Sequence, residues 1–209
     1  MSPAYLTING IYENTIIIEH SKFICFLKGV SDEADAKNFI DAIRKKHSLA
    51  THNCYAYIAD DKGLIQKFSD DGEPQGTAGL PMLEVLKNKK LYKTVAVVTR
   101  YFGGIKLGTG GLTRAYSSSV VEAVEKAKID NVFNSEIIEF ELSYETYSKI
   151  IKFFDSEKVS IIETNFSDNV YVKIAVKSSC FDNFINSLNN AFNGKLDYKK
   201  LQSTYFSFR

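Results

Sequence analysis

The order of the elements expected in the second half of the chain restricts the fold more than any other feature. Alternating apolar residues indicate strands, and apolar residues at helical spacing indicate two amphipathic helices. In chain order these elements are a strand at 135–143, a helix at 144–157, strands at 158–163 and 169–177, a helix at 180–192 and a strand at about 198–207. This β-α-β-β-α-β order is the split β-α-β pattern of ferredoxin-like domains. The sequence therefore predicts a ferredoxin-like domain in the second half of an α+β protein.

The first half mixes strands and helices in another order and predicts a separate domain. Its expected elements are a hairpin at 13–30, a helix at 32–47, a second hairpin made by 53–59 and 63–68, a helix near 78–89, a buried strand at 92–102 and a helix at about 111–128. Ser31 is the expected N-cap of the first helix, and Ser179 with Asp182 resembles a capping box. For 209 residues with a polar stretch near 130, we predict two domains, residues 1–131 and 132–209.

Composition excludes several classes of protein. The 26 basic and 25 acidic residues give a net charge of +1, so any nucleic-acid surface must be a local patch. Three widely spaced cysteines, Cys25, Cys54 and Cys180, make neither a disulfide framework nor a zinc ribbon. The start of the chain shows no signal peptide, and the apolar runs are too short to span a membrane. We therefore expect a cytoplasmic protein without a membrane partner.

Glycine is concentrated between residues 103 and 111, where a buried strand is expected to pass into a helix. Five of these nine residues are glycine, namely Gly103, Gly104, Gly108, Gly110 and Gly111. Glycine permits close approach to a ligand, and the free N–H groups of a helix start favour an anion. The loop matches neither the P-loop pattern nor the dinucleotide-binding spacing. Two interpretations stay open: an anion or phosphate site, and a loop that wraps tightly around its own fold.

Basic residues surround this glycine-rich segment. No acidic residue occurs between Glu84 and Glu122, an interval that contains Lys87, Lys89, Lys90, Lys93, Arg100, Lys106 and Arg114. Cations beside aromatic residues are typical of nucleic-acid surfaces, because the charges bind phosphates and the rings stack on bases. Lysines at a helix end need no such role, but Arg100 and Arg114 bracket the glycines. We therefore predict a nucleic-acid or anion site formed by Arg100, Tyr101, Lys106, Arg114 and the five glycines.

An acidic segment at 70–79 allows two interpretations. Asp70, Asp71 and Glu73 could hold a hard cation or act as general acids and bases. Asp-Gly and Glu-Pro pairs are also turn signals, and acids before a helix suit its dipole, so the structural interpretation is favoured. The same acids could form ion pairs with Arg100 or Arg114 and thereby close one loop on the other.

The histidines and cysteines do not indicate chemistry. His52 and Cys54, with the distant His20, lack the spacing of a zinc site. A cysteine and a histidine two residues apart on one strand point in parallel rather than at each other, so a nucleophile pair is not favoured. We predict no catalytic residue, no metal and no cofactor.

Three segments together resemble the IMPACT/YigZ family. They are residues 50–57 (ATHNCYAY), 70–81 (DDGEPQGTAGLP) and 99–112 (TRYFGGIKLGTGGL). The resemblance implies a first domain similar to domain IV of elongation factor G, an α/β sandwich with a left-handed crossover. It implies a ferredoxin-like second domain similar to domain V. It carries no catalytic residue set, and it associates the eukaryotic relatives with translation control under amino-acid starvation, through protein–protein competition.

The leading hypothesis is a non-enzymatic regulatory protein that contacts RNA or the ribosome through the basic surface around the glycine-rich loop. A second hypothesis is a phosphate- or nucleotide-binding enzyme, in which the glycine-rich loop holds phosphate and Asp70, Asp71 and Glu73 hold magnesium. A third is an adaptor that binds only a regulatory protein. The sequence leaves the oligomeric state open.

Overall fold

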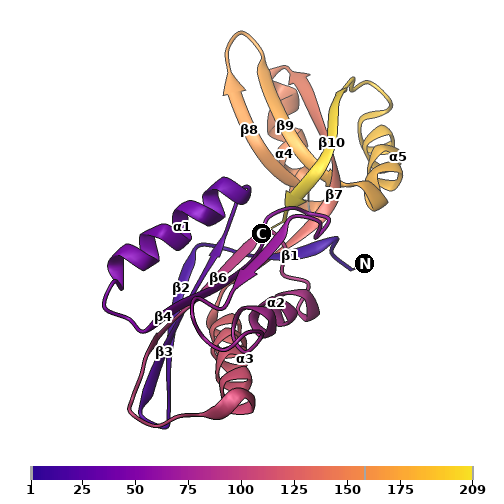
Figure 1. Cartoon of the computed structure of the whole chain (residues 1–209). Coiled ribbons are helices and arrows are strands. Elements are labelled where there is room, and N and C mark those ends of the chain that lie inside the picture. The colour runs from indigo at the N-terminus through magenta and orange to yellow at the C-terminus, as the bar shows by residue number, and fades with distance from the viewer. Residues whose placement is uncertain (1, 158, 209) are drawn as a thin grey trace. The chain divides into compact units, whose positions relative to one another are not determined.

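The structure is a computed structural model that describes residues 2–157 and 159–208. The described chain has two β-sheets and five α-helices, which confirms the α+β class (Figure 1). It divides into two compact units, and the division lies between Asp130 and Asn131. Residues 2–4 belong with the second unit, and residues 5–130 form the first. None of the helices in the described part is long and apolar enough to cross a membrane.

The sheet of the first unit has five strands in the order β2-β3-β6-β4-β5. The strands are β2 (Ile11–Ile18), β3 (Ser21–Gly29), β4 (His52–Ile58), β5 (Gln66–Ser69) and β6 (Thr94–Tyr101). All neighbours pair in antiparallel fashion, and both predicted hairpins are observed. The β-branched central strand β6 is buried from Thr94 to Arg100, because helices cover both faces of the sheet.

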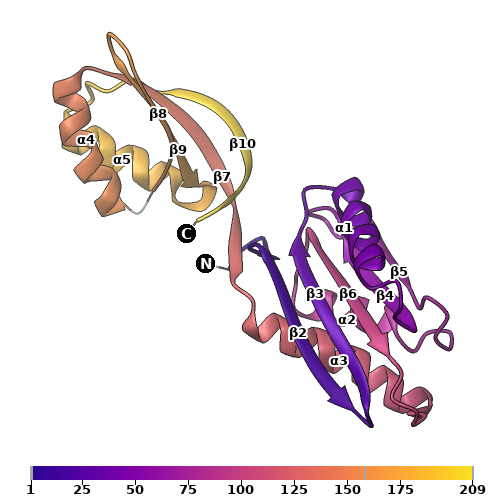
Figure 2. The ribbon, with the colours of Figure 1, turned by 90° about the vertical axis from the view of Figure 1, so that its left-hand side faces the viewer.

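Helix α1 (Glu33–Lys46) covers one face of this sheet, and α2 (Gly79–Asn88) and α3 (Gly108–Lys126) cover the other (Figure 2). The unit is therefore a sandwich of three layers. The N-cap of α1 is Asp32, whose carboxylate accepts from Asp35 N at 2.9 Å, so the choice of Ser31 was wrong by one residue. Both residues are good caps, and the structure uses the side chain nearer to the first turn.

The second unit shows the predicted β-α-β-β-α-β order. Its elements are β7 (Ile129–Leu142), α4 (Tyr144–Glu157), β8 (Ser160–Phe166), β9 (Val170–Lys177), α5 (Phe181–Phe192) and β10 (Lys199–Ser207). The strands lie side by side in the order β10-β7-β9-β8, all antiparallel, which is the split β-α-β arrangement. The short strand β1 (Tyr5–Ile8) belongs to the first unit. Apolar residues of α4 and α5 pack with the sheet in one core.

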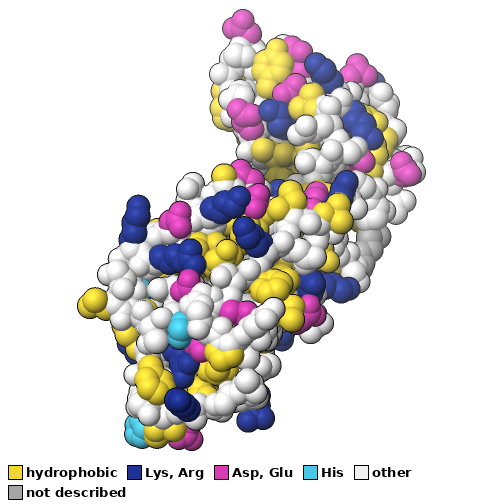
Figure 3. Space-filling view, in the orientation of Figure 1, with side chains coloured by type: hydrophobic (Ala, Val, Ile, Leu, Met, Phe, Trp, Pro, Cys, Tyr) yellow, Lys and Arg dark blue, Asp and Glu magenta, His cyan; other side chains and the backbone are white. Residues whose placement is uncertain are grey.

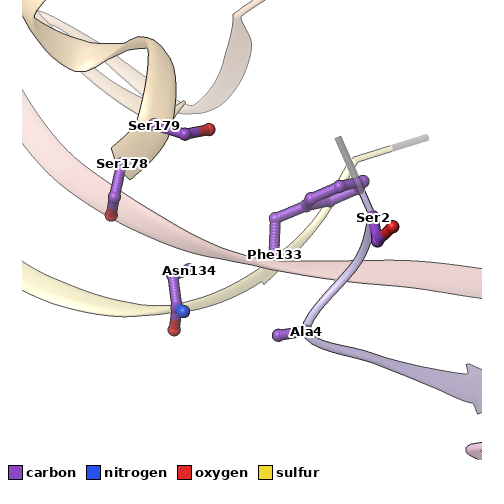
Figure 4. Close-up of a pocket in the computed structure, with 6 residues that line it drawn as sticks. All are labelled: Ser2, Ala4, Phe133, Asn134, Ser178 and Ser179. Carbon is purple, nitrogen blue, oxygen red and sulfur yellow. The ribbon is translucent and has the colours of Figure 1, made fainter.

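Two local predictions in the second unit were wrong. Strand β7 begins at Ile129, six residues earlier than predicted, because its first residues continue directly from α3. The capping box is not formed at Ser179, since a short 3₁₀ turn (Ser178–Cys180) precedes α5 and makes Cys180 its N-cap. A pocket of about 450 Å³ lies beside this turn, and its lining residues carry no charge (Figure 4).

Candidate nucleic-acid interface

The predicted site lies at the end of the first unit where β6 ends and α3 begins. Arg100 is the last buried residue of β6, and its side chain is only 6% exposed. Its Nη1 donates to Glu73 Oε1 at 2.7 Å, and its Nη2 donates to Ser21 Oγ at 3.3 Å. The guanidinium carbon lies 5.3 Å from the ring centre of Phe23 and 5.4 Å from that of Phe102. The predicted pairing of an acidic residue with Arg100 is thus observed, through Glu73.

Glu73 is the centre of a buried polar network. Tyr116 of α3 donates its hydroxyl to Glu73 Oε1 at 2.7 Å, and His52 Nε2 lies 3.8 Å from Glu73 Oε2. Burial raises the pKa of the Tyr116 hydroxyl, so Tyr116 remains a proton donor to the carboxylate. Burial also raises the pKa of the Cys54 thiol, which donates to the backbone oxygen of Asp70 at 2.9 Å. A thiol held in its protonated form is not an activated nucleophile.

The two aspartates hold the acidic segment in place. Asp70 accepts from the backbone N–H groups of Gly76, Ala78 and Gly79 at 2.8–3.0 Å, which caps the start of α2. Asp71 accepts from Arg44 Nη2 at 2.8 Å and from Asn53 N at 2.7 Å.

The carboxylates of the acidic segment therefore have separate protein partners, as the favoured structural interpretation expects. Among the described residues, no group of three or more His, Cys, Asp or Glu side chains could hold a metal ion. The magnesium site of the enzyme hypothesis is not formed by Asp70, Asp71 and Glu73.

The glycines serve two different purposes. Gly103 lies against the backbone of the β2–β3 turn, where a Cβ atom would come within 2.0 Å of the His20 carbonyl carbon. Gly104 and Gly108 have φ angles of +89° and +68° in the turn that leads into α3. Helix α3 begins at Gly108, three residues earlier than predicted, so Gly110 and Gly111 also belong to its first turn.

The start of α3 is open to a ligand. Its N-cap residue, Leu107, makes no side-chain hydrogen bond to the helix, and the first turn contains no acidic residue. The first N–H groups of a helix have no partner within the helix and carry a partial positive charge. Lys106 and Arg114 are exposed next to this turn. In Figure 3, hydrophobic and basic side chains lie next to one another at the lower end of the view, where α3 begins.

A pocket of about 390 Å³ lies between the segments 70–81 and 99–112. It is lined by Glu73, Pro74, Arg100, Phe102, Lys106, Leu107, Gly108, Thr109 and Leu112. One acidic and two basic side chains line it, and the acidic one is already paired with Arg100. Lys106 and the start of α3 therefore leave the pocket with a net positive character.

The basic residues of the acid-free interval do not form a single patch. Lys87 and Lys89 lie at the C-terminal end of α2, and Lys93 precedes β6. Arg100 is seven residues beyond Lys93 along this strand, a distance of about 23 Å. Of the predicted site residues, Lys106, Gly108 and Arg100 line one pocket, whereas Arg114 is exposed in the second turn of α3 and does not line it. Half-buried Tyr101 has its hydroxyl 3.0 Å from His47 Nδ1.

Sequence reasoning noted Phe102 among the aromatic residues near the cations but left it out of the predicted site, and it did not single out Leu107; both residues form apolar walls of the pocket. Phe102 is 47% exposed directly after a buried strand, so it cannot be a core residue. A large aromatic residue between a strand and a glycine-rich loop was the available signal.

The comparisons with known proteins place the chain in a family. The family model of the Impact N-terminal domain matches residues 19–124. This range includes the segments 70–81 and 99–112 and helix α3 up to Val124. The chain belongs to the IMPACT family. IMPACT family member YvyE of Bacillus subtilis is 43% identical over 205 residues, which cover 98% of this chain and 94% of that protein.

A more distant relative shares only part of the chain. Protein IMPACT-A of Xenopus tropicalis is 35% identical over 103 residues, or 47% of this family member and 32% of the relative. A crystal structure described as that of a hypothetical protein matches with a TM-score of 0.59 and 30% identity, covering 97% of this chain and 98% of the other. The two-unit arrangement of elements along the chain is therefore shared with a solved structure.

Proposed function

We propose that this IMPACT family member is a non-enzymatic, translation-related protein that contacts RNA or the ribosome through the start of α3. The observation that carries the proposal is a glycine-rich helix start that lacks both a side-chain cap and an acidic residue, with exposed Lys106 just before it and exposed Arg114 in the next turn of the helix. Cations and free backbone N–H groups are the donors that proteins use for phosphate oxygens. The eukaryotic relatives bear the name IMPACT, and the family resemblance associates them with translation control.

The residues of the site would share the work. Lys106 and Arg114 would form ion pairs with phosphates, and the N–H groups near Gly110 and Gly111 would donate hydrogen bonds to a phosphate at the helix start. Arg100 would contribute positive charge from the buried wall of the pocket, where its ion pair with Glu73 fixes its position. Exposed Phe102 and Ile105 would supply apolar contacts to bases.

The test compares two variants that remove the same charge. Lys106→Ala/Arg114→Ala removes two exposed cations at the site, and Lys67→Ala/Lys89→Ala removes two exposed cations elsewhere on the unit. Binding of a single-stranded RNA oligonucleotide and co-sedimentation with ribosomes are measured for wild type and both variants at low and moderate salt. We expect the first variant to lose about tenfold or more in affinity and the second to bind nearly as wild type.

Arg100 is kept in both variants, because removing it would leave Glu73 buried without its partner. Equal binding by wild type and Lys106→Ala/Arg114→Ala would overturn the proposal. Absence of RNA and ribosome binding at low salt would favour the alternative that this surface binds only a regulatory protein.

We further propose that the two units act on the ribosome as domains IV and V of elongation factor G do. The three-layer first unit and the split β-α-β second unit support this comparison. Elongation factor G should then reduce co-sedimentation of this protein with ribosomes in proportion to its concentration. Simultaneous binding of both proteins to one ribosome would contradict the comparison.

A cytoplasmic location is part of the proposal. Cys25, Cys54 and Cys180 are all free thiols, and the first two are buried. Free cysteines in an ordered fold fit a reducing compartment such as the cytosol, where ribosomes are found.

A further inference from the structure

We infer that the pocket between Phe102 and the start of α3 is a subsite for one nucleotide, with the phosphate at the helix start and the base on the Phe102 ring. This inference rests on the proposed function for the source of the nucleotide, which is an RNA strand. It adds the chemistry of the ligand, since a surface that binds only phosphates needs no pocket. A volume of about 390 Å³ lies within the range of pockets that hold small organic ligands, about 300–1,000 Å³.

The phosphate end of the pocket is formed by α3 and the residue before it. Gly108 and Thr109 line the pocket in the first helical turn, and Lys106 lines it from the preceding loop. Gly108 and Gly110 have no atom within 4 Å of where a Cβ would lie, so the space that a side chain would fill at these positions is open. A phosphate there would meet helix N–H groups and one ammonium group together.

The other walls of the pocket are apolar. Phe102, Leu107, Leu112 and Pro74 all line it, and Phe102 keeps 47% of its surface exposed. An aromatic face next to a phosphate site is the arrangement in which proteins stack a nucleobase. Inorganic phosphate would leave these walls without a contact, which is why a whole nucleotide fits the pocket better.

Arg100 supplies an observation independent of the helix. Its side chain is nearly fully buried and forms part of the pocket wall, and its Nε atom has no hydrogen-bond partner. The other guanidinium nitrogens donate to Glu73 and Ser21. The Nε atom is closed to solvent, so an anion in the pocket would interact with the guanidinium charge across the pocket wall rather than through a hydrogen bond to Nε.

The direct test is equilibrium dialysis of the full chain against labelled nucleoside 5′-monophosphates. Matched samples contain the corresponding nucleoside or inorganic phosphate alone. We expect saturable binding of the monophosphates and at least tenfold weaker binding of either fragment. Equal binding of phosphate and nucleotide would overturn the assignment of the base to Phe102.

Two variants of one position test the phosphate end without disturbing the fold. Thr109→Asp places a carboxylate in the first turn of α3, where an acidic group stabilises a helix but repels phosphate. Thr109→Asn introduces a side chain of nearly the same shape as aspartate but without its charge. We expect Thr109→Asp to lose nucleotide binding by tenfold or more and Thr109→Asn to keep it. Unchanged binding by Thr109→Asp would overturn the inference.

The base end is tested by Phe102→Leu, which keeps an apolar side chain but removes the aromatic face. Leu80→Ala, at an exposed leucine of α2 outside the pocket, is its control. We expect Phe102→Leu to weaken monophosphate binding about tenfold and to leave phosphate binding unchanged. Equal losses by Phe102→Leu and Leu80→Ala would argue against stacking on Phe102.

RNA binding measured on the same samples separates the two proposals. RNA binding that depends on Lys106 and Arg114, without saturable binding of monophosphates, would leave the proposed function standing and overturn the subsite. Binding of monophosphates without RNA or ribosome binding would support the subsite as one for free nucleotides and overturn the proposed function.

Discussion

Arg100 and Glu73 form the contact on which the geometry of the site depends most. Both side chains are almost fully buried, and the hydroxyls of Tyr116 and Ser21 add one hydrogen bond to Glu73 and one to Arg100. Burying two charges is costly, and the cost is recovered only when partners and geometry are good. Breaking such a pair from one side leaves the other charge buried without compensation.

Arg100→Ala should therefore destabilise the first unit by about 3–5 kcal/mol. The free energy of unfolding from urea titrations measures this loss. Arg44→Ala is the control, because Arg44 also pairs with an acidic residue, Asp71, but its side chain is 38% exposed. A partly exposed pair of this kind contributes at most about 1 kcal/mol. Similar losses of stability in the two variants would show that the buried pair contributes no more than the partly exposed one.

Glu136 of the second unit gives a prediction on pH. Hydrogen bonds from Ser203, Lys200 and Ser178 hold the pKa of this carboxyl below its ordinary value of 4.5. A lowered pKa in the folded state means that ionised Glu136 stabilises the fold above its unfolded pKa. This stabilisation is lost as the pH falls through the folded pKa.

Wild type should thus be more stable than Glu136→Gln near neutral pH, and this difference should shrink as the pH falls below about 4.5. Urea titrations of both proteins at several pH values measure it. A difference that stays constant down to acid pH would show that the charge of Glu136 contributes nothing.

Helices α2 and α3 both begin at the site, and they begin differently. Asp70 accepts from the N–H groups of Ala78, the N-cap residue of α2, and of Gly79, its first residue, whereas α3 starts at Leu107 and Gly108 without a side-chain cap. A capped start is closed to ligands and an uncapped one is available. This contrast between neighbouring helices supports a binding role for α3 alone.

Asp70→Ala should destabilise the first unit by about 1–2 kcal/mol, because α2 loses its cap. Asp70→Asn should lose less, since the amide oxygen still accepts hydrogen bonds. Urea titration of the three proteins gives the order. If the alanine and asparagine variants were equally stable, the cap would not depend on the side-chain oxygens.

The glycines of the loop and helix should respond in opposite directions to alanine. Gly103→Ala places a Cβ against the His20 backbone and should cost about 1–3 kcal/mol. Gly110→Ala meets open space inside a helix and should stabilise by up to about 1 kcal/mol. Thermal unfolding of both variants measures the difference. A stabilising Gly103→Ala would contradict the close approach.

The periodic elements could be predicted from the sequence, and their ends were less accurate. Helix α4 (Tyr144–Glu157) and the strands of both hairpins follow from apolar spacing, which is a local property. The start of β7 at Ile129 and the early start of α3 at Gly108 depend on neighbouring strands and loops, which spacing does not encode.

The candidate site was predicted in part. The glycines, Lys106 and Arg114 were found because composition is unusual around them. The sequence did not decide whether Arg100 is buried and paired with Glu73. Its burial depends on the central position of β6 in the sheet, between two layers of helices. Lys87, Lys89 and Lys93 are separated from the site by the length of β6. The charge pattern of the sequence does not show this separation.

The central claim, that exposed cations at the start of α3 bind RNA phosphates, is tested most directly by the salt dependence of RNA binding. The logarithm of the binding constant is measured against the logarithm of salt concentration for wild type and Lys106→Ala/Arg114→Ala. Each phosphate contact on single-stranded RNA contributes a slope of about −0.7, so losing two contacts should flatten the slope by about 1.4. Equal slopes for the two proteins would contradict the account.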